Sequence, residues 1–224
     1  MILDKIARNY STRARRRRGE MFVDLLKPTA QDKILDFGGS TGAHLASVIP
    51  FRENVHICDI STGALATAEK KYGFTGVLLN DTGPLPFPDD YFDIVFCSSV
   101  IEHVTGSKDS LRAIQSSQEF INAALARQAE FAQEIRRISK RYFVQTPYKY
   151  FPIESHTWLP FFFVFLPRPQ QIRTIDFMNS WWPKRTSPDW NLLTKMQMQQ
   201  LFPGAEIVAE KSFGLTKSLI AISS

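Results

Sequence analysis

The stretch "KILDFGGSTGAHLASVI", Lys33 to Ile49, joins a short apolar run to a glycine-rich turn and a helix-like segment. Asp36 stands two positions before Gly38, the first glycine of that turn. In an open parallel sheet, ligands bind outside the carboxyl ends of the strands, where the strand order reverses. Glycine also allows the backbone to approach a ligand closely. The stretch therefore predicts a ligand site that carries a carboxylate.

Further apolar runs bounded by turn residues follow along the chain: "VHICDI", "TGVLLN", "FDIVFCSS" and "RYFVQTP". Helix-like segments separate the early runs, and this alternation is typical of a parallel sheet covered on both faces. The last two runs, "AEIVAEKSF" and "SLIAISS", are separated only by "GLTK", so they predict an antiparallel hairpin. The expected fold is α/β: a Rossmann-like, doubly wound sheet, mostly parallel, with an antiparallel C-terminal hairpin.

The chain of 224 residues, 44% of them hydrophobic, can bury one sizeable core. We therefore predict a single domain over residues 1–224, with a basic helical segment at 1–30. The segment 147–190 is rich in proline and aromatic residues and is too long for an ordinary connection, so it is expected to be a lid-like insertion.

Capping residues delimit one of the helices. In "STGALATAEKKYG", Ser61 is the expected N-cap and Gly73 the expected stop. The segment from Leu111 to Ser139 predicts two helices or one bent helix.

The longest apolar run, "FFFVFL", is far shorter than the roughly 20 residues that cross a bilayer. No secretory signal is recognisable at the start, so the expected location is the cytoplasm, with peripheral contact with a membrane left open. The cysteines Cys58 and Cys97 are expected on strands that flank a common neighbour. That places them roughly 9 to 10 Å apart, too far for a disulfide, so both are expected to be reduced.

The turn matches the dinucleotide fingerprint G-x-G-x-x-G/A poorly. Counted from Gly38, Ser40 stands where the fingerprint has its second glycine, and Ala43 stands at its last position. The carboxylate of Asp36 would also repel a diphosphate, whereas it would attract a cationic amine.

"ILDFGGSTG" resembles motif I of class I S-adenosylmethionine (SAM) dependent methyltransferases, hhDhGxGxG. Asp36, Gly38 and Gly42 match the motif, and Ser40 replaces its middle glycine. The likeness extends to the ubiquinone-biosynthesis methyltransferase group. It implies a seven-stranded fold, SAM as cofactor with S-adenosylhomocysteine as product, and a methionine amino group held by Asp36 and the turn.

The same resemblance covers roughly the first half of the chain. Asp59 resembles the acid that takes the ribose hydroxyls, and Asp81 with Thr82 resembles the pair that contacts adenine. "LPFPDDYFDIVFCSSVIEHV" resembles the loop, fourth strand and following turn of small-molecule methyltransferases. Each of these pieces taken alone is also explained as an ordinary turn or strand-end residue. The full predicted cofactor set is Asp36, Gly38, Gly39, Ser40, Gly42, Asp59, Ile60, Asp81, Thr82 and Ser98.

An acceptor hydroxyl or ammonium must lose a proton, and histidine is the usual base near neutral pH. Of the four histidines, His44 and His56 are expected to be structural, because one lies on the first helix and one inside a strand. His156 with Glu154 is predicted to deprotonate or position the acceptor, while His103 with Glu102 shapes the opposite wall. The alternative is that His156 only caps a turn.

"TPYKYFPIESHTWLPF", which contains His156, resembles "TPN-x-x-FPIE-x-H" of some small class I methyltransferases, with Tyr148 in place of the asparagine. "SSVIEHV" resembles the "E-V-x-E-H-V" metal site of ubiquinone-biosynthesis O-methyltransferases, but Ser99 replaces the first glutamate. The predicted site therefore includes no metal.

The net charge of +5 and the arginines Arg13 and Arg15 to Arg18 favour acidic partners. The leading prediction is an O- or N-methyltransferase for a small-molecule acceptor, phosphorylated or apolar, whose linkage to a lipid or glycan is left open. An RNA methyltransferase is an alternative, although no RNA-binding appendage or "NPPY"-type motif is present. A non-catalytic interaction protein that keeps the fold is the third.

Overall fold

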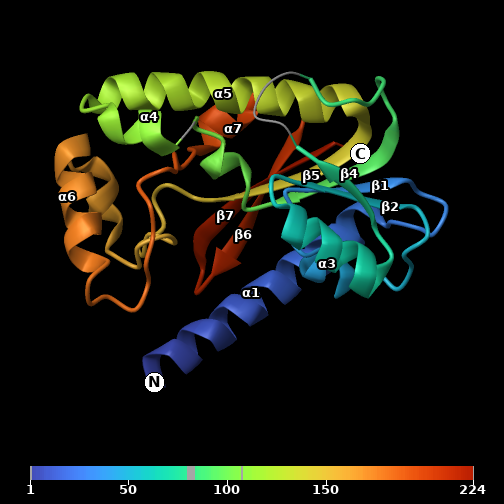
Figure 1. The fold of residues 1–224 in the computed structure, drawn as a ribbon, viewed down its shortest axis with the longest axis horizontal. Coiled ribbons are helices and arrows are strands. Elements are labelled where there is room, and N and C mark those ends of the chain that lie inside the picture. The colour runs from blue at the N-terminus through green and yellow to red at the C-terminus, as the bar shows by residue number, and fades with distance from the viewer. Residues whose placement is uncertain (1, 80–83, 107, 224) are drawn as a thin grey trace. The chain divides into compact units, whose positions relative to one another are not determined.

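The computed structural model describes residues 2–79, 84–106 and 108–223 (Figure 1). Within these residues, seven strands form one sheet in the order β3-β2-β1-β4-β5-β7-β6. The strands are β1 (Ile34–Phe37), β2 (Val55–Asp59), β3 (Thr75–Leu78), β4 (Phe92–Ser98), β5 (Ser139–Pro147), β6 (Glu206–Ser212) and β7 (Leu215–Ser223). The α/β class, the mostly parallel sheet and the antiparallel C-terminal strands predicted from the sequence are confirmed.

Helices connect most of the strands. They are α1 (Ile2–Leu26), α2 (Ala43–Ala46), α3 (Thr62–Tyr72), η1 (Ile101–His103), α4 (Lys108–Ala113), α5 (Ser117–Ile138), η2 (Phe161–Phe165), α6 (Arg168–Met178) and α7 (Lys195–Leu201). Ser61 caps α3 by accepting a hydrogen bond from the amide of Ala64, and Gly73 ends it in the left-handed conformation, as predicted. The segment after Leu111 divides into two helices, α4 and α5, rather than one bent helix.

The strand order reverses beside β1. β1 pairs in parallel with β2 on one side and with β4 on the other, and Phe37 is in register with both Cys58 and Cys97. The two cysteines therefore lie two strands apart, and both are buried and reduced, as expected. The carboxyl end of β1 is the topological switch point of the sheet, where open α/β sheets bind ligands.

The chain divides into two compact units. The first unit comprises Met1–Ser98, Glu134–Val144 and Ala221–Ser224, and the second comprises Ser99–Gln133 and Gln145–Ile220. The single-domain organisation over 1–224 stays a prediction.

The core of the first unit forms around β1 and β4, whose apolar side chains are almost wholly buried. The basic helix α1 packs on this core through Phe22, which has no exposed surface. The Phe22 ring lies 4.7 Å from that of Phe96 and 5.6 Å from that of Phe143, measured between centroids. The predicted N-terminal segment is therefore an integral helix of this unit.

The second unit contains the predicted insertion, and that segment has its own small core. Phe163, Ile175, Trp190 and Leu192 are buried together. An isolated bridge between Ile153 and Pro160 closes the loop that precedes η2. Among the described residues, no helix is both long and apolar enough to cross a bilayer.

Candidate functional site

The glycine-rich turn after β1 is strongly bent. Gly38, Ser40 and Gly42 all have positive φ angles, of 67°, 53° and 71°. Glycine adopts this region freely, whereas Ser40 does so at a cost of about 1 to 2 kcal/mol. Strain of this kind collects at functional sites, where surrounding contacts hold it in place.

Asp36 lies under this turn in an unusual environment for a carboxylate. It is 2% exposed, and its Oδ2 atom has no hydrogen-bond partner among the residues that the structure describes. A Cβ atom at Gly39 would come within 2.2 Å of the Asp36 carboxyl group, so only glycine leaves room there. Burial, helped by the charge of Asp59, raises the pKa of Asp36 to about 7. A buried carboxylate with an unused oxygen is suited to an incoming cation, such as the amino group of methionine.

Asp59, the last residue of β2, holds the turn in shape. Its two carboxylate oxygens accept hydrogen bonds from the amides of Ser40, at 2.9 Å, and Ser61, at 3.0 Å. The structural role considered from the sequence is thus present. A carboxylate has about four lone-pair positions, so two remain for the hydroxyls of a ribose.

The remaining residues of the predicted cofactor set differ in their positions in the structure. Ile60, next to Asp59, is 72% exposed and presents an apolar side chain suited to the face of a base. Ser98 ends β4, the neighbour of β1. Asp81 and Thr82 lie outside the described residues, so their predicted role is unchanged.

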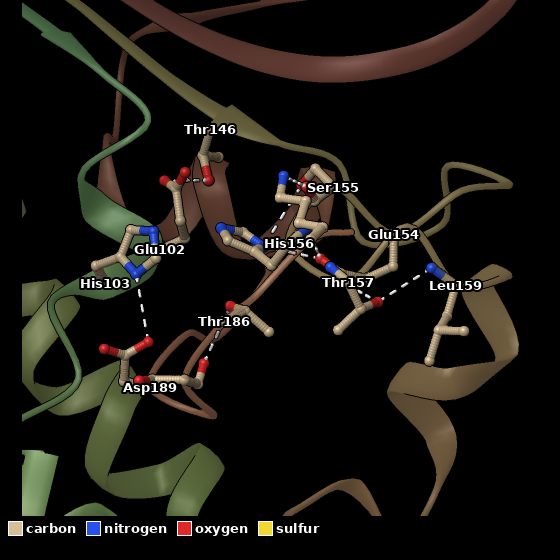
Figure 2. Close-up of polar contacts among 12 residues, drawn as sticks. Glu102, His103, Thr146, Glu154, Ser155, His156, Thr157, Leu159, Thr186 and Asp189 are labelled. Carbon is tan, nitrogen blue, oxygen red and sulfur yellow. Dashed lines mark hydrogen bonds and ion pairs between the residues drawn. The ribbon is translucent and has the colours of Figure 1, made fainter. Parts of the chain in front are cut away.

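In the second unit, Glu154 and His156 form a buried acid and imidazole pair (Figure 2). Glu154 Oε1 accepts from His156 Nδ1 and from the His156 amide, both at 2.8 Å. Its Oε2 accepts from the amide and the hydroxyl of Thr157, both at 2.6 Å. Burial alone would raise the pKa of Glu154, but these hydrogen bonds hold it below its ordinary value.

An ionised Glu154 determines the tautomer of His156. A carboxylate can only accept, so Nδ1 carries the ring proton and Nε2 presents its lone pair. The imidazole is also stacked on Trp190, with centroids 4.9 Å apart and planes 18° apart. The ring is therefore fixed in position with one nitrogen available.

His103 approaches His156 edge to face, with centroids 4.9 Å apart. Its Nδ1 lies 3.7 Å from Asp189 Oδ1, as the dashed line in Figure 2 shows. The backbone carbonyl of Asp189 accepts from the hydroxyl of Thr105 at 2.8 Å. Each of the two histidines thus faces an acidic residue.

A buried amide network holds this part of the second unit together. Gln128 of α5, which has no exposed surface, donates to the carbonyls of Ile101 and Asn191 at 2.9 and 3.0 Å. Asn191 Nδ2 returns a 2.9 Å bond to Gln128 Oε1. The network ties η1, which carries Glu102 and His103, to the segment that carries Asp189 and Trp190.

Glu102, His103 and His156 each offer one metal-ligand atom, and these atoms lie within 4.8 Å of one another. Glu102 is fully buried; its Oε2 accepts from Thr146 at 3.0 Å, and its Oε1 has no hydrogen-bond partner in the described part of the chain. Two imidazoles and a carboxylate are a donor set that suits Zn²⁺ or Fe²⁺. The residues thus fit a divalent metal, although the sequence prediction included none.

The other two histidines behave as the structural residues expected. His44 Nε2 lies 2.9 Å from the carbonyl oxygen of Arg15, and its ring packs on Phe96. Burial, opposed by that hydrogen bond and aided by nearby arginine charge, lowers the pKa of His44 to about 4. Burial also lowers the pKa of His56, which packs against Phe92.

Sequence reasoning missed Asp189, Trp190 and Thr146 as neighbours of the histidine pair. Asp189 and Trp190 follow Pro188 at the end of the insertion, and Thr146 precedes the "PYKYFPIESH" stretch. A polar residue at the end of a strand is the only signal that could have indicated Thr146.

Comparison with known proteins agrees with this geometry. Residues 35–120 match the family described as "Methyltransferase domain". Over these residues the chain is similar to class I SAM-dependent methyltransferases, as predicted from its sequence. SAM as the cofactor agrees with the Asp36 oxygen that lacks a hydrogen-bond partner among the described residues.

The sequence relatives are ubiquinone/menaquinone biosynthesis C-methyltransferases named UbiE. The one from Vibrio vulnificus is 32% identical over 91 residues, which cover 37% of this chain and 35% of that protein. The one from Shewanella frigidimarina is 30% identical over 92 residues, 37% of each chain. The match spans about a third of the length of these relatives.

Solved structures share the methyltransferase fold. The PH0226 protein from Pyrococcus horikoshii OT3 superposes with a TM-score of 0.54 at 14% identity, covering 94% of this chain and 89% of that one. The small RNA methyltransferase HEN1 superposes with a TM-score of 0.51 at 20% identity, covering 93% of this chain and 25% of that one.

The raised pKa of Asp36 predicts a specific pH dependence of stability. Between about pH 4 and pH 7 the folded state holds a proton on Asp36 that the unfolded state has lost, so wild-type stability falls as pH rises through this window. Asp36→Asn removes the ionisation. Its unfolding free energy should exceed that of wild type by an amount that grows across the window, to at most about 4 kcal/mol, and stays constant above it.

Denaturant unfolding of both proteins at pH 4, 5, 6, 7 and 8 measures this difference. A difference that is independent of pH would show that Asp36 titrates normally.

Proposed function

We propose that this protein transfers the methyl group of SAM to a small-molecule acceptor that loses a proton in the reaction. The observation that carries the proposal is the His156 imidazole, whose Nδ1 proton is held by a buried carboxylate and whose Nε2 is available as a base. Bound SAM would supply an electrophilic methyl group on a positively charged sulfur.

The first unit supplies the cofactor site in this proposal. The Asp36 carboxylate would bind the methionine amino group, and the free lone pairs of Asp59 would accept from the ribose hydroxyls. Because binding a cation favours the ionised carboxylate, cofactor binding would bring the pKa of Asp36 down from about 7 and release its proton.

The second unit supplies the proton acceptor. When Nε2 of His156 takes a proton, the ring becomes a cation, and the ionised Glu154 at 2.8 Å stabilises it. The four hydrogen bonds that Glu154 accepts keep its carboxylate ionised for this role. His103, paired with Asp189, would form the adjoining wall.

The need for a base limits which atoms the protein could methylate. A hydroxyl, an ammonium or a carbon beside an activating group must each lose a proton before or during methylation. The relatives named C-methyltransferases support including carbon acceptors beside the O and N acceptors expected from the sequence. Lipid or glycan linkage of the acceptor is a further part of the proposal.

The insertion supports an apolar acceptor or contact with a membrane surface. Phe161, Phe162 and Phe165 of η2 are 41%, 61% and 56% exposed, although they are large apolar side chains. Exposed aromatic clusters of this kind mark interaction sites. We propose η2 as the membrane-facing element. The exposed arginines Arg13 and Arg15 to Arg17 of α1 support attraction to anionic partners.

Cofactor binding tests the first half of the proposal. Calorimetry should show SAM and S-adenosylhomocysteine binding to wild type, loss of binding in Asp36→Ala and Asp59→Ala, and unchanged binding in the control Asp24→Ala, an exposed acid on α1. Affinity should rise about tenfold per pH unit up to pH 7 and then level off, because Asp36 must ionise. Absence of binding by wild type would favour the non-catalytic alternative.

Turnover tests the base. With an acceptor found by screening, His156→Ala should lower kcat about 100-fold or more, and Glu154→Gln by a smaller factor, because the amide oxygen still accepts from Nδ1 without carrying charge. Glu119→Gln, an exposed residue of α5, is the matched control.

A chelator separates the base from a metal role for the same imidazole. The proposal expects EDTA-treated enzyme to retain its rate. A loss of rate that divalent cations restore would instead assign Glu102, His103 and His156 to a metal. Near-normal turnover of both His156→Ala and His103→Ala would exclude both roles.

Membrane contact is tested by flotation with liposomes that contain an anionic phospholipid. Phe162→Ser should reduce the bound fraction several-fold, while Phe213→Ser, which is 92% exposed but outside the insertion, should not. If wild type does not float, η2 is not a membrane element.

A further inference from the structure

The second unit encloses a cavity of about 210 Å³ that the proposed chemistry does not use. Its walls include the aromatic rings of Phe120, Phe165 and Trp190. Two cationic side chains, Lys149 and Arg168, also line it. Apolar walls with a few polar groups are the usual composition of a small-molecule site.

The ammonium group of Lys149 lacks a counter-ion. Lys149 is half-buried, and in the described part of the chain no carboxylate lies within ion-pair distance of it. Its Nζ lies 6.0 Å from the centroid of the Phe165 ring, the outer limit of a cation–π contact. Burial lowers the pKa of Lys149, which is the effect of placing this charge against apolar groups without compensation.

Arg168 is the second cation at the cavity; burial lowers its pKa to about 10, and the charge of Asp189 only partly opposes that effect. It is 2% exposed, its guanidinium lies 3.7 Å from the centroid of the Phe120 ring, and its Nη2 donates to the carbonyls of Leu111 and Pro188 at 3.3 and 2.5 Å. Within the described residues it forms no ion pair with a carboxylate. Arg168 begins α6, whose N-terminal end adds positive potential.

Two buried N–H donors at this cavity lack acceptors. Nε of Arg168 and Nε1 of Trp190 are both buried without a hydrogen-bond partner among the described residues. Buried polar groups are nearly always satisfied, so two orphan donors on lining residues indicate an acceptor that arrives with a ligand. The contacts of Arg168 with Phe120, Leu111 and Pro188 occupy its guanidinium face and its Nη2. They leave the two unpartnered N–H donors and the charge of Lys149 unexplained.

We propose that this cavity binds the anionic end of an apolar small molecule, with a carboxylate or phosphate oxygen group placed toward Lys149 and Arg168 and apolar atoms against the aromatic walls. The inference rests on the proposed function in one respect: the molecule is the methyl acceptor. Trp190 supports this link, because the indole that lines the cavity is also stacked on the His156 ring. The acceptor class is therefore an acidic amphiphile.

The test titrates the full chain, without SAM, with hexanoate, hexyl phosphate and hexanol by calorimetry. At least one anion should bind ten or more times tighter than hexanol, and the tighter anion identifies carboxylate or phosphate as the head group. Lys149→Met should weaken the anion tenfold or more and leave hexanol unchanged. Lys195→Met, an exposed lysine of the same unit, is the matched control.

The variant Trp190→Phe is a second, independent test of anion binding. It removes the unpartnered N–H and keeps a ring beside His156, so anion binding should weaken by a larger factor than hexanol binding. Equal binding of hexanol and both anions, or anion affinity unchanged in Lys149→Met, would overturn the proposal. Since SAM is absent, failure of the proposed methyl transfer would not alter these results.

Discussion

The parallel pairing of β1 with both β2 and β4 determines where the polar groups of the first unit lie. The register aligns the ends of the three strands, so that Asp36 and Asp59 come out at one edge of the sheet. The glycine-rich turn then folds back over Asp36, and the Ser40 amide bonds to Asp59. A shift of one residue in either strand would turn these carboxylates to the opposite face of the sheet.

Two buried carboxylates, Glu154 and Asp36, differ in hydrogen bonding and in the direction of their pKa shift. Glu154 accepts four hydrogen bonds from its own loop, and its pKa lies below the ordinary value. Asp36 has an unsatisfied oxygen, and its pKa rises to about 7. The first arrangement is complete within the chain and orients a neighbour, whereas the second would be completed by a ligand that brings positive charge.

Local patterns made much of the fold predictable from the sequence. The strands and the C-terminal hairpin follow from apolar runs and their spacing, and the ends of α3 follow from Ser61 and Gly73, because caps depend on a few adjacent residues. The Glu154 and His156 pair was also predictable, since the two residues are two positions apart. By contrast, the approach of Asp189 to His103 spans 86 positions and depends on the path of the insertion, which no local pattern encodes. The same holds for Lys149 and Arg168 at one cavity.

The loop from Glu154 to Thr157 has a consequence for how this protein can change. Both nitrogens through which Glu154 holds His156 belong to His156 itself, and the other two donors belong to its neighbour Thr157. The hydrogen bonds that orient the imidazole thus lie within four consecutive residues, and the stacked ring of Trp190 supports it from outside this loop. Substitutions of cavity residues outside this loop, such as Lys149 and Arg168, would change the cavity while these four hydrogen bonds are retained. In the proposed function, substitutions could therefore change the acceptor that is bound without changing the residue that takes its proton.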